Sequence, residues 1–189
     1  MSNIVRHYAL GVRIVDREIS STWTVYIDGA CPGNGTRSAR AGYGVYYEHS
    51  ANLNSSMPLD LVDDLTVNRP TNQRAELFAL RHALREAEFY FDYGIKYLIM
   101  TDSMYIKNCM DVWVHKWIQN DWTNSKGFDV ANKELIQETY QLYKDICVKY
   151  RRKGWQPMEI CHVPGHSGNI GNEKADALAR QASDRCGVY

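Results

Sequence analysis

The hydrophobic periodicity of the chain changes at Pro70, and this change constrains the fold more than any other feature. Before Pro70, apolar and polar residues alternate in short runs bounded by Gly, Pro and Asn, which is typical of strands. After it, apolar residues recur at helical spacing from Ala75 to Phe91, with Thr71 as a cap and Gly94 as a stop. The pattern therefore predicts a group of strands followed by alternating helices and strands.

The remaining runs predict one mixed domain. Three short β-rich runs separated by turn residues favour an antiparallel meander, and a mostly apolar run that ends at Asp102 is typical of a buried central strand. We expect an α/β fold with a five-stranded mixed sheet, three antiparallel strands and then two further strands, flanked by helices. The expected strands are 22–28, 41–48, roughly 59–66, 95–101 and 156–163. The expected helices are 75–91, an interrupted helix over 104–117, one that opens at 129 or 132, and one that opens at 172.

Length and composition fit a single domain. A chain of 189 residues, 44% of them hydrophobic, can bury a substantial core without covalent cross-links. Its five cysteines are scattered and include no C-x-x-C pair, so we expect reduced thiols rather than a zinc site or a disulfide framework. No run is long and apolar enough to span a bilayer. We expect an intracellular protein with no membrane partner, in the nucleus or cytoplasm, with the mitochondrion left open.

The sequence divides into three parts. Residues 1–21 form a leader or arm, in which Asp16 and Glu18 are untypical of a signal or transit peptide. The domain proper covers 22–183, and 184–189 form a C-terminal tail. Lysine plus arginine and aspartate plus glutamate both number 22, so the net charge does not indicate a nucleic-acid-binding protein. Any contact with phosphate groups must come from a local basic patch.

Four acidic residues stand where a core-facing pattern would not require them. Asp28 and Asp102 each end a predicted strand, while Glu76 and Asp176 lie beside apolar residues of predicted helices. Singly, such residues are usually turn formers or complements to a helix dipole. Together at one edge of a sheet, they would repel one another and take up protons unless cations neutralised them. Magnesium prefers such oxygen ligands, and two ions about 3.5–4 Å apart can promote phosphoryl displacement.

Four sequence motifs carry a resemblance to a known family. They are Y-I-D-G-A-C-P-G-N-G (26–35), R-P-T-N-Q-R-A-E-L (69–77), T-D-S-M-Y-I (101–106) and H-V-P-G-H-S-G-N-I-G-N-E-K-A-D-A-L-A-R (162–180). With these motifs in this order, the chain resembles type 1 ribonuclease H, and in detail its eukaryotic members. The resemblance covers about residues 22 to 182. It implies the ribonuclease H-like fold, with 22–183 as the catalytic domain.

The resemblance implies an endoribonuclease that hydrolyses the RNA strand of RNA–DNA hybrids and leaves 5′-phosphate and 3′-hydroxyl ends. The metal ligands of the family fall on Asp28, Glu76, Asp102 and Asp176, the same set as above. They would hold two Mg²⁺ ions, for which Mn²⁺ is an expected substitute. The loop histidine of the family falls on His166, which would transfer protons or aid product release, since imidazole titrates near neutrality.

On the RNA strand, the resemblance assigns contacts to three amide side chains, Asn34, Asn72 and Gln73. In the family these positions contact the minor groove, where the 2′-hydroxyl distinguishes RNA from DNA. An amide suits this contact because it both donates and accepts hydrogen bonds. Turn or capping roles remain an alternative reading for Asn34 and Asn72.

On the DNA strand, the resemblance assigns a phosphate pocket to Arg69, Thr71 and Asn132. Thr71 and Asn132 lie at predicted helix starts, where free N–H groups favour an anion. Trp113 falls in the segment that matches the protruding handle of the family, where a flat ring presses on deoxyribose. We interpret Trp117 and Trp122 as packing residues of that segment.

Three functions other than a free-standing ribonuclease H are compatible with parts of the sequence. The ribonuclease H domain of a retroelement reverse transcriptase is the alternative, since such domains share these motifs. The positions of Met1 and of the last helix favour a free-standing protein. A DNA-acting nuclease or transposase of the same fold is disfavoured by the R-P-T-N-Q-R-A-E motif (69–76). A non-catalytic binding module is disfavoured by the intact acid set. We expect a monomer whose partner is an RNA–DNA hybrid.

Overall fold

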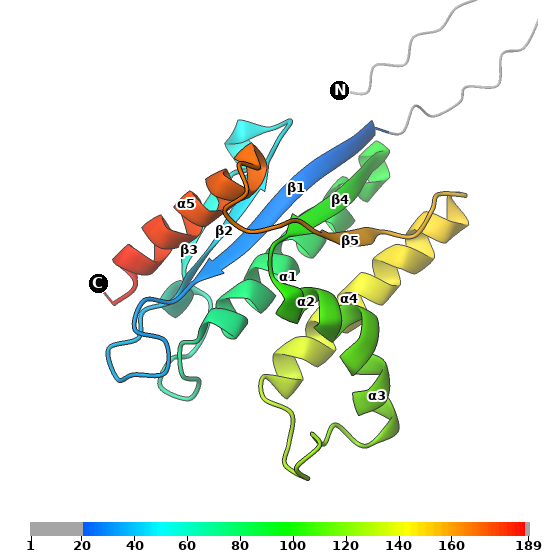
Figure 1. Cartoon of the computed structure of the whole chain (residues 1–189). Helices are drawn as coiled ribbons and strands as arrows, with labels where there is room; N and C mark the ends of the chain where they lie inside the picture. Colours follow the sequence, from blue (N-terminus) through cyan, green and yellow to red (C-terminus); the bar gives the residue numbers. More distant parts are fainter. Residues whose placement is uncertain (1–20, 188–189) are drawn as a thin grey trace, which may run out of the picture.

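The structure, a computed structural model, describes residues 21–187 and is built on a five-stranded sheet (Figure 1). The spatial order of the strands is β3-β2-β1-β4-β5. β1 pairs antiparallel with β2 and parallel with β4, β2 pairs antiparallel with β3, and β4 pairs parallel with β5. The predicted mixed sheet is therefore confirmed. The strands are β1 (Ser21–Ala30), β2 (Gly42–Tyr47), β3 (Ser55–Pro58), β4 (Ile95–Thr101) and β5 (Glu159–His162).

Helices cover both faces of the sheet. α1 packs against β1 and α4, while α5 packs against β2 and β1 (Figure 1). Between β4 and α4 the chain forms the expected interrupted helix, in which a π-helical turn, η4 (Cys109–Trp113), joins two short α-helices. Single 3-10 turns are η1 (Ala51–Leu53), η2 (Leu59–Leu61) and η3 (Phe91–Tyr93). The α-helices are α1 (Asn72–Tyr90), α2 (Met104–Asn108), α3 (Val114–Gln119), α4 (Lys133–Arg152) and α5 (Ile170–Arg185).

The prediction of a third strand over roughly 59–66 is wrong. The strand lies earlier, at Ser55–Pro58, and the predicted segment forms the 3-10 turn η2 and then hydrogen-bonded turns. The polar Ser55 and Ser56 hide this strand from a hydrophobic pattern, because an edge strand needs ladder bonds more than buried side chains. Downstream, the Asp64 carboxylate accepts from the backbone N–H and the hydroxyl of Thr66, which stabilises a turn instead of a strand.

The other boundaries differ by a few residues. The last strand is shorter than predicted, and α5 begins at Ile170 because Asn169 caps it by accepting from the N–H of Asn172 over 3.0 Å. The predicted leader, 1–21, lies almost wholly outside the described residues, and of the predicted tail only 184–187 are described. No helix among residues 21–187 is both long enough and apolar enough to cross a membrane.

Two glycines of β2 let α5 rest directly on the sheet. A Cβ at Gly44 would come within 2.2 Å of the Ala175 carbonyl oxygen, and one at Gly42 within 2.4 Å of the Ser183 nitrogen. Facing them, the inner surface of α5 is made of fully buried alanines, including Ala179. The helix therefore approaches the backbone of β2 without large side chains between them, and this contact fixes the height of α5 above the sheet.

Candidate active site

Asp28 and Asp102 occupy the same edge of the sheet. β1 and β4 run parallel, and Tyr26 pairs with Met100, so each aspartate stands two positions beyond that pair. The Asp28 carboxylate accepts from the backbone N–H of Gly29 over 2.8 Å. Neighbouring parallel strands end at the same edge of a sheet. The observed register therefore puts Asp28 and Asp102 side by side, as expected.

Glu76 reaches this edge from the first turns of α1. A Cβ at Gly29 would meet the backbone nitrogen of Glu76 at 2.6 Å, so the absence of a side chain there brings β1 and α1 together. Glu76 is 9% exposed and accepts two hydrogen bonds, from Asn72 Nδ2 over 2.7 Å and from Ser103 Oγ over 2.6 Å. Thr71 caps the helix by accepting from the N–H of Arg74.

Asp176 and Asn172 project from α5. The half-buried Asp176 carboxylate forms an ion pair with Arg180 Nε over 2.9 Å, one helical turn further along. Asn172 is 3% exposed and donates from Nδ2 to Asp102 Oδ2 over 2.8 Å. Its Oδ1 is buried and meets no hydrogen-bond partner among the described residues. A buried oxygen of this kind is a further acceptor beside the contact with Asp102.

Electrostatic coupling places the four acids in one cluster. Burial raises the pKa of Asp28 from 3.8 to about 8, and repulsion by the Asp102 carboxylate adds to the shift. Asp176 and Glu76 raise the same pKa further, while the N–H of Gly29 lowers it. Burial, aided by Asp102, raises the pKa of Glu76 from 4.5 to about 7. The cluster thus holds too much negative charge for its surroundings and favours protons or cations.

These donors suit a hard divalent cation, although the side chains are not arranged around one. Among residues 21–187, no group of three or more His, Cys, Asp or Glu side chains is placed so as to enclose a metal ion. Glu76, Asp102 and Asp176 instead each accept from a protein donor. An all-oxygen set with raised carboxyl pKa values fits magnesium, which binds through one or two carboxylates and keeps several waters.

His166 lies in the exposed loop that follows β5. Its φ of 51° is left-handed, a conformation uncommon for a residue with a side chain. A Cβ at the preceding Gly165 would fall 2.9 Å from Asp102 Oδ2, so the loop backbone lies against an acid of the cluster. Ser167 Oγ donates to the Pro164 carbonyl oxygen over 2.7 Å and closes the turn. The loop therefore carries the histidine beside the cluster.

The amides assigned to the RNA strand lie around the N-terminus of α1. Asn34 Oδ1 accepts from the backbone N–H of Asn72 over 3.3 Å, which ties the β1–β2 loop to the helix start. The Asn72 side chain is committed to Glu76, as described above. Gln73 is exposed. The structure brings all three side chains to one region that borders Glu76.

Arg74 joins the residues assigned to the DNA phosphate, and the sequence did not single it out. It forms a buried ion pair with Asp63 and donates to Asn132 Oδ1 over 3.1 Å. Asn132 adopts φ 59° as the N-cap of α4, so this bond connects the starts of two helices. Thr71 lies at the start of α1, where its hydroxyl accepts a hydrogen bond from the backbone N–H of Arg74. Arg69 is exposed.

The tryptophans form a continuous row along the segment from α2 to α4. Trp113 contacts the ring of Tyr105 at a centroid distance of 5.9 Å and that of Trp117 at the same distance. Trp117 in turn lies 6.1 Å from Trp122. All three tryptophans are partly buried against the core. The row fits the interpretation of Trp117 and Trp122 as packing residues.

Sequence reasoning also missed Ser103 and Asn172, which hold the acids Glu76 and Asp102 in place. Ser103 directly follows Asp102, and its hydroxyl also caps α2 by accepting from the N–H of Ile106. A serine that follows a strand-end aspartate predicts a helix cap. Its second contact, with Glu76, is visible only in the fold. Nothing in the sequence marks Asn172 beyond its position near a helix start.

Comparisons with known proteins agree with this geometry. A family model described as RNase H matches residues 20–184. Mouse Ribonuclease H1 is 38% identical over 159 residues, which cover 84% of this chain and 49% of that protein. Ribonuclease H of Orientia tsutsugamushi is 36% identical over 155 residues, covering 82% and 78% respectively. The chain thus spans about half the length of the mouse protein and most of the bacterial one.

Solved structures share the fold. The crystal structure of LC9-RNase H1, described as a type 1 RNase H with the type 2 active-site motif, matches with a TM-score of 0.59 at 27% identity, over 87% of this chain and 73% of that one. The solution structure of the PFV RNase H domain matches with a TM-score of 0.64 at 23% identity, over 89% and 98%, and shows the fold alone. With the family model covering nearly its whole length, this chain belongs to the RNase H family.

Proposed function

We propose that the chain is an endoribonuclease that hydrolyses the RNA strand of RNA–DNA hybrids and leaves 5′-phosphate and 3′-hydroxyl ends. The observation that carries this proposal is the parallel register of β1 and β4, which puts Asp28 and Asp102 at one edge of the sheet. Glu76 and Asp176 lie close enough to add to the repulsion on the Asp28 carboxylate. A protein gains nothing in stability from buried acids that repel one another, so such a cluster indicates a functional site. The membership of the RNase H family supplies the reaction class.

In this proposal Asp28, Glu76, Asp102 and Asp176 hold two Mg²⁺ ions, with Mn²⁺ as a substitute. Bound there, the ions supply an activated water and positive charge for the displacement at phosphorus. The chain itself restricts where the carboxylates can point. Asn172 and Ser103 donate to Asp102 and Glu76 respectively and leave the remaining lone pairs of each carboxylate for other partners.

His166 acts on the proton balance of the reaction in this proposal. Its exposed position in the loop against Asp102 lets the imidazole exchange protons with solvent and with a leaving 3′-oxygen. Gly165 precedes His166 and Gly168 follows Ser167, so the loop can let the ring approach and withdraw without disturbing β5. This places His166 as a group that moves protons or releases product, not as a metal ligand.

Substrate discrimination in this proposal rests on two strips of side chains. Asn34, Asn72 and Gln73 border Glu76 and would read the 2′-hydroxyl groups of the RNA strand. The DNA strand would lie on the phosphate pocket at the paired starts of α1 and α4, which consists of Arg69, Thr71 and Asn132. Trp113 would lie against the deoxyribose.

A cellular enzyme is favoured over a reverse transcriptase domain. Identity to mouse Ribonuclease H1 is 38%, against 23% to the PFV RNase H domain. A cellular ribonuclease H and the domain of a reverse transcriptase would catalyse the same reaction within different proteins. Cleavage assays therefore test the chemistry that both functions share.

The deciding experiment is a substrate panel. The chain is incubated with an end-labelled RNA–DNA hybrid, duplex RNA, duplex DNA and single strands of the same sequence, with Mg²⁺ and with chelator. We expect internal cuts only in the RNA of the hybrid, only with Mg²⁺, and 3′-hydroxyl ends that a polymerase extends. Cleavage of duplex DNA, or undiminished cleavage in chelator, would overturn the proposal.

A further inference from the structure

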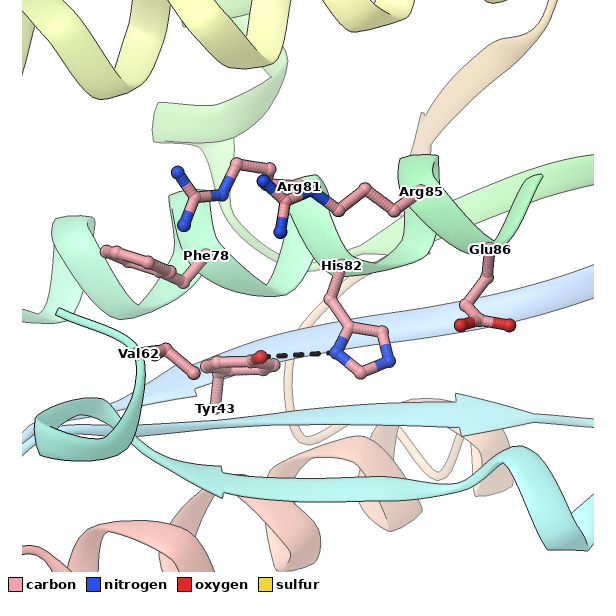
Figure 2. Close-up of a pocket in the computed structure, with 7 residues that line it drawn as sticks. All are labelled: Tyr43, Val62, Phe78, Arg81, His82, Arg85 and Glu86. Atoms are coloured by element: carbon pink, nitrogen blue, oxygen red, sulfur yellow. Dashed lines mark hydrogen bonds between the residues drawn. The ribbon is translucent and has the colours of Figure 1, made fainter. Parts of the chain in front are cut away.

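A second pocket lies on the face of α1 that is turned toward β2 and η2 (Figure 2). It has a volume of about 390 Å³, and none of the four clustered acids lines it. Its wall along α1 carries Phe78, Arg81, His82 and Arg85, and the two arginines and His82 lie at least one turn beyond Glu76. This pocket is therefore separate from the candidate active site and from the residues assigned to the hybrid.

Two guanidinium groups gather at one end of the pocket. Figure 2 shows the Arg85 side chain extending back along the helix toward Arg81 instead of outward. Arg81 lies over the Phe78 ring, 4.3 Å from its centroid, and donates to Glu138 Oε2 over 2.9 Å. Arg85 forms no hydrogen bond or ion pair with any residue in 21–187. Burial and the neighbouring Arg85 both lower the pKa of Arg81, so the pair is short of negative charge.

The floor of the pocket adds neutral donors. The Tyr43 hydroxyl and His82 Nδ1 are hydrogen-bonded over 3.1 Å, as Figure 2 shows. Burial and Arg85 lower the pKa of His82, which favours the neutral imidazole. In the tautomer in which the phenol donates to Nδ1, the ring carries its proton on Nε2. No side chain among the described residues accepts a hydrogen bond from that nitrogen.

The opposite end of the pocket carries negative charge instead of positive charge. Glu86 lines it there and points away from the arginines in Figure 2. Glu86 also adds to the rise in the pKa of Tyr47 and Tyr97, whose buried hydroxyls have no hydrogen-bond partner among residues 21–187. An anion is therefore attracted to the arginine end and repelled from the Glu86 end. The pocket is polarised along its length.

We propose that this pocket binds a phosphate group, either as free inorganic phosphate or as the monoester of a small metabolite, between Arg81 and Arg85. A carboxylate offers two oxygens and one charge, whereas a phosphate monoester offers three oxygens and up to two charges, enough for two guanidinium forks. The cavity of about 390 Å³, which Arg81, His82 and Arg85 line, has room for such a group and for a small organic residue attached to it. The ligand is a small molecule.

The test is a titration of the whole, metal-free chain followed by NMR. The Nε–H signals of the arginines and the His82 ring signals are recorded while inorganic phosphate or ribose 5-phosphate is added at constant ionic strength, with acetate as a separate arm. We expect saturable shifts at Arg81, Arg85 and His82 with phosphate. Ribose 5-phosphate binding more tightly than phosphate identifies the monoester as the ligand, and the reverse identifies the free ion.

Three variants locate the binding. Arg85→Gln removes one guanidinium from an exposed position, so the fold remains and the affinity for phosphate falls about tenfold. Arg152→Gln, at the exposed end of α4, leaves the affinity unchanged. Arg69→Gln, in the region proposed to bind the DNA phosphate, also leaves it unchanged. Shifts that do not saturate, equal binding of acetate, or an equal loss in Arg69→Gln or Arg152→Gln would refute the proposal.

Discussion

The side-chain amide of Asn172 donates to the Asp102 carboxylate over 2.8 Å, although 70 positions separate the two residues in the chain. Asn172 is buried on α5, and Asp102 directly follows β4, so this bond joins a helix to the edge of the sheet that bears the acids. The bond holds one oxygen of Asp102 in a fixed direction and stabilises its charged form.

Asn172→Ala should therefore reduce turnover without removing an acid. We expect kcat for hybrid cleavage to fall about 10- to 100-fold, as for other groups that orient ligands, with KM little changed. Without the amide donor the direction of the Asp102 carboxylate is no longer fixed, so the loss should appear in kcat and leave the binding of the hybrid almost unchanged. Steady-state kinetics, with thermal unfolding of the same variant, test this. A loss of thermal stability with kcat unchanged would show that Asn172 is only a packing residue.

Asp102→Asn should abolish the proposed reaction. The substitution keeps the size of the side chain and removes its charge, so we expect turnover to fall by about three orders of magnitude or more while the circular dichroism spectrum is retained. Asp121→Asn is the matched control, since Asp121 is exposed and its left-handed φ of 54° suits asparagine. Near-normal cleavage by Asp102→Asn with Mg²⁺ contradicts the assignment of the acid cluster.

The stability of the metal-free protein should fall as pH rises. The folded-state pKa values of Asp28 and Glu76, about 8 and about 7, lie above their usual values of 3.8 and 4.5. The native state thus binds more protons than the unfolded state across this range, and its advantage is lost progressively from about pH 4 to pH 8. Urea unfolding in chelator from pH 5 to pH 8 measures this decline.

Magnesium should reverse that trend, since a cation replaces the protons. We expect the rise in Tm on adding Mg²⁺ to be larger at pH 8 than at pH 6. Asp28→Asn should flatten the dependence on pH in chelator and diminish the effect of magnesium. A rise in Tm that is the same at both pH values would mean that the ion binds away from these carboxylates.

Gly44→Ala should destabilise the fold and misplace Asp176. The new methyl would overlap the Ala175 carbonyl oxygen, so α5 must move away from β2. Overpacking of this kind costs about 1–3 kcal/mol in the free energy of unfolding. We also expect kcat to fall, because α5 carries Asp176 and Asn172. Ala177→Leu, which enlarges the exposed face of the same helix, is the control and should change stability by less than about 0.5 kcal/mol.

Trp113→Ala should weaken the hybrid without altering the chemistry. If the ring lies against deoxyribose, its loss raises KM while kcat is retained at saturating hybrid. Trp122→Ala, at the other end of the aromatic row, should instead lower thermal stability and affect KM less. A larger effect on KM from Trp122 than from Trp113 would reverse the roles of the two rings.

Much of the fold could be predicted because its signals are local. The strand over 95–101 is found at those residues, and the helix after Pro70 is found with its Thr71 cap. The third strand was misplaced because an edge strand of serines lacks the hydrophobic alternation on which the prediction depended. Conversely, Leu59 is buried from within a 3-10 turn, which a hydrophobic pattern cannot distinguish from a strand.

The acids of the site could be predicted, but the groups that hold them could not. Asp28 and Asp102 are conspicuous because a charged residue ends an apolar strand. The contacts from Ser103 to Glu76, from Arg74 to Asn132 and from Asn172 to Asp102 join residues that lie 27 to 70 positions apart. They depend on the register of the sheet and on the height of α5. Neither the register of the sheet nor the height of α5 can be inferred from the local sequence.

The direct contact between α5 and β2 limits which substitutions this protein can accept. Since backbone meets backbone there, no side chain can be exchanged to adjust the separation, and the helix and strand behave as one stiff piece. Substitutions elsewhere in the interior can alter stability without displacing Asp176, so the geometry of the acid cluster is insulated from most of the chain. The same stiffness leaves the two glycines of β2 with no acceptable replacement.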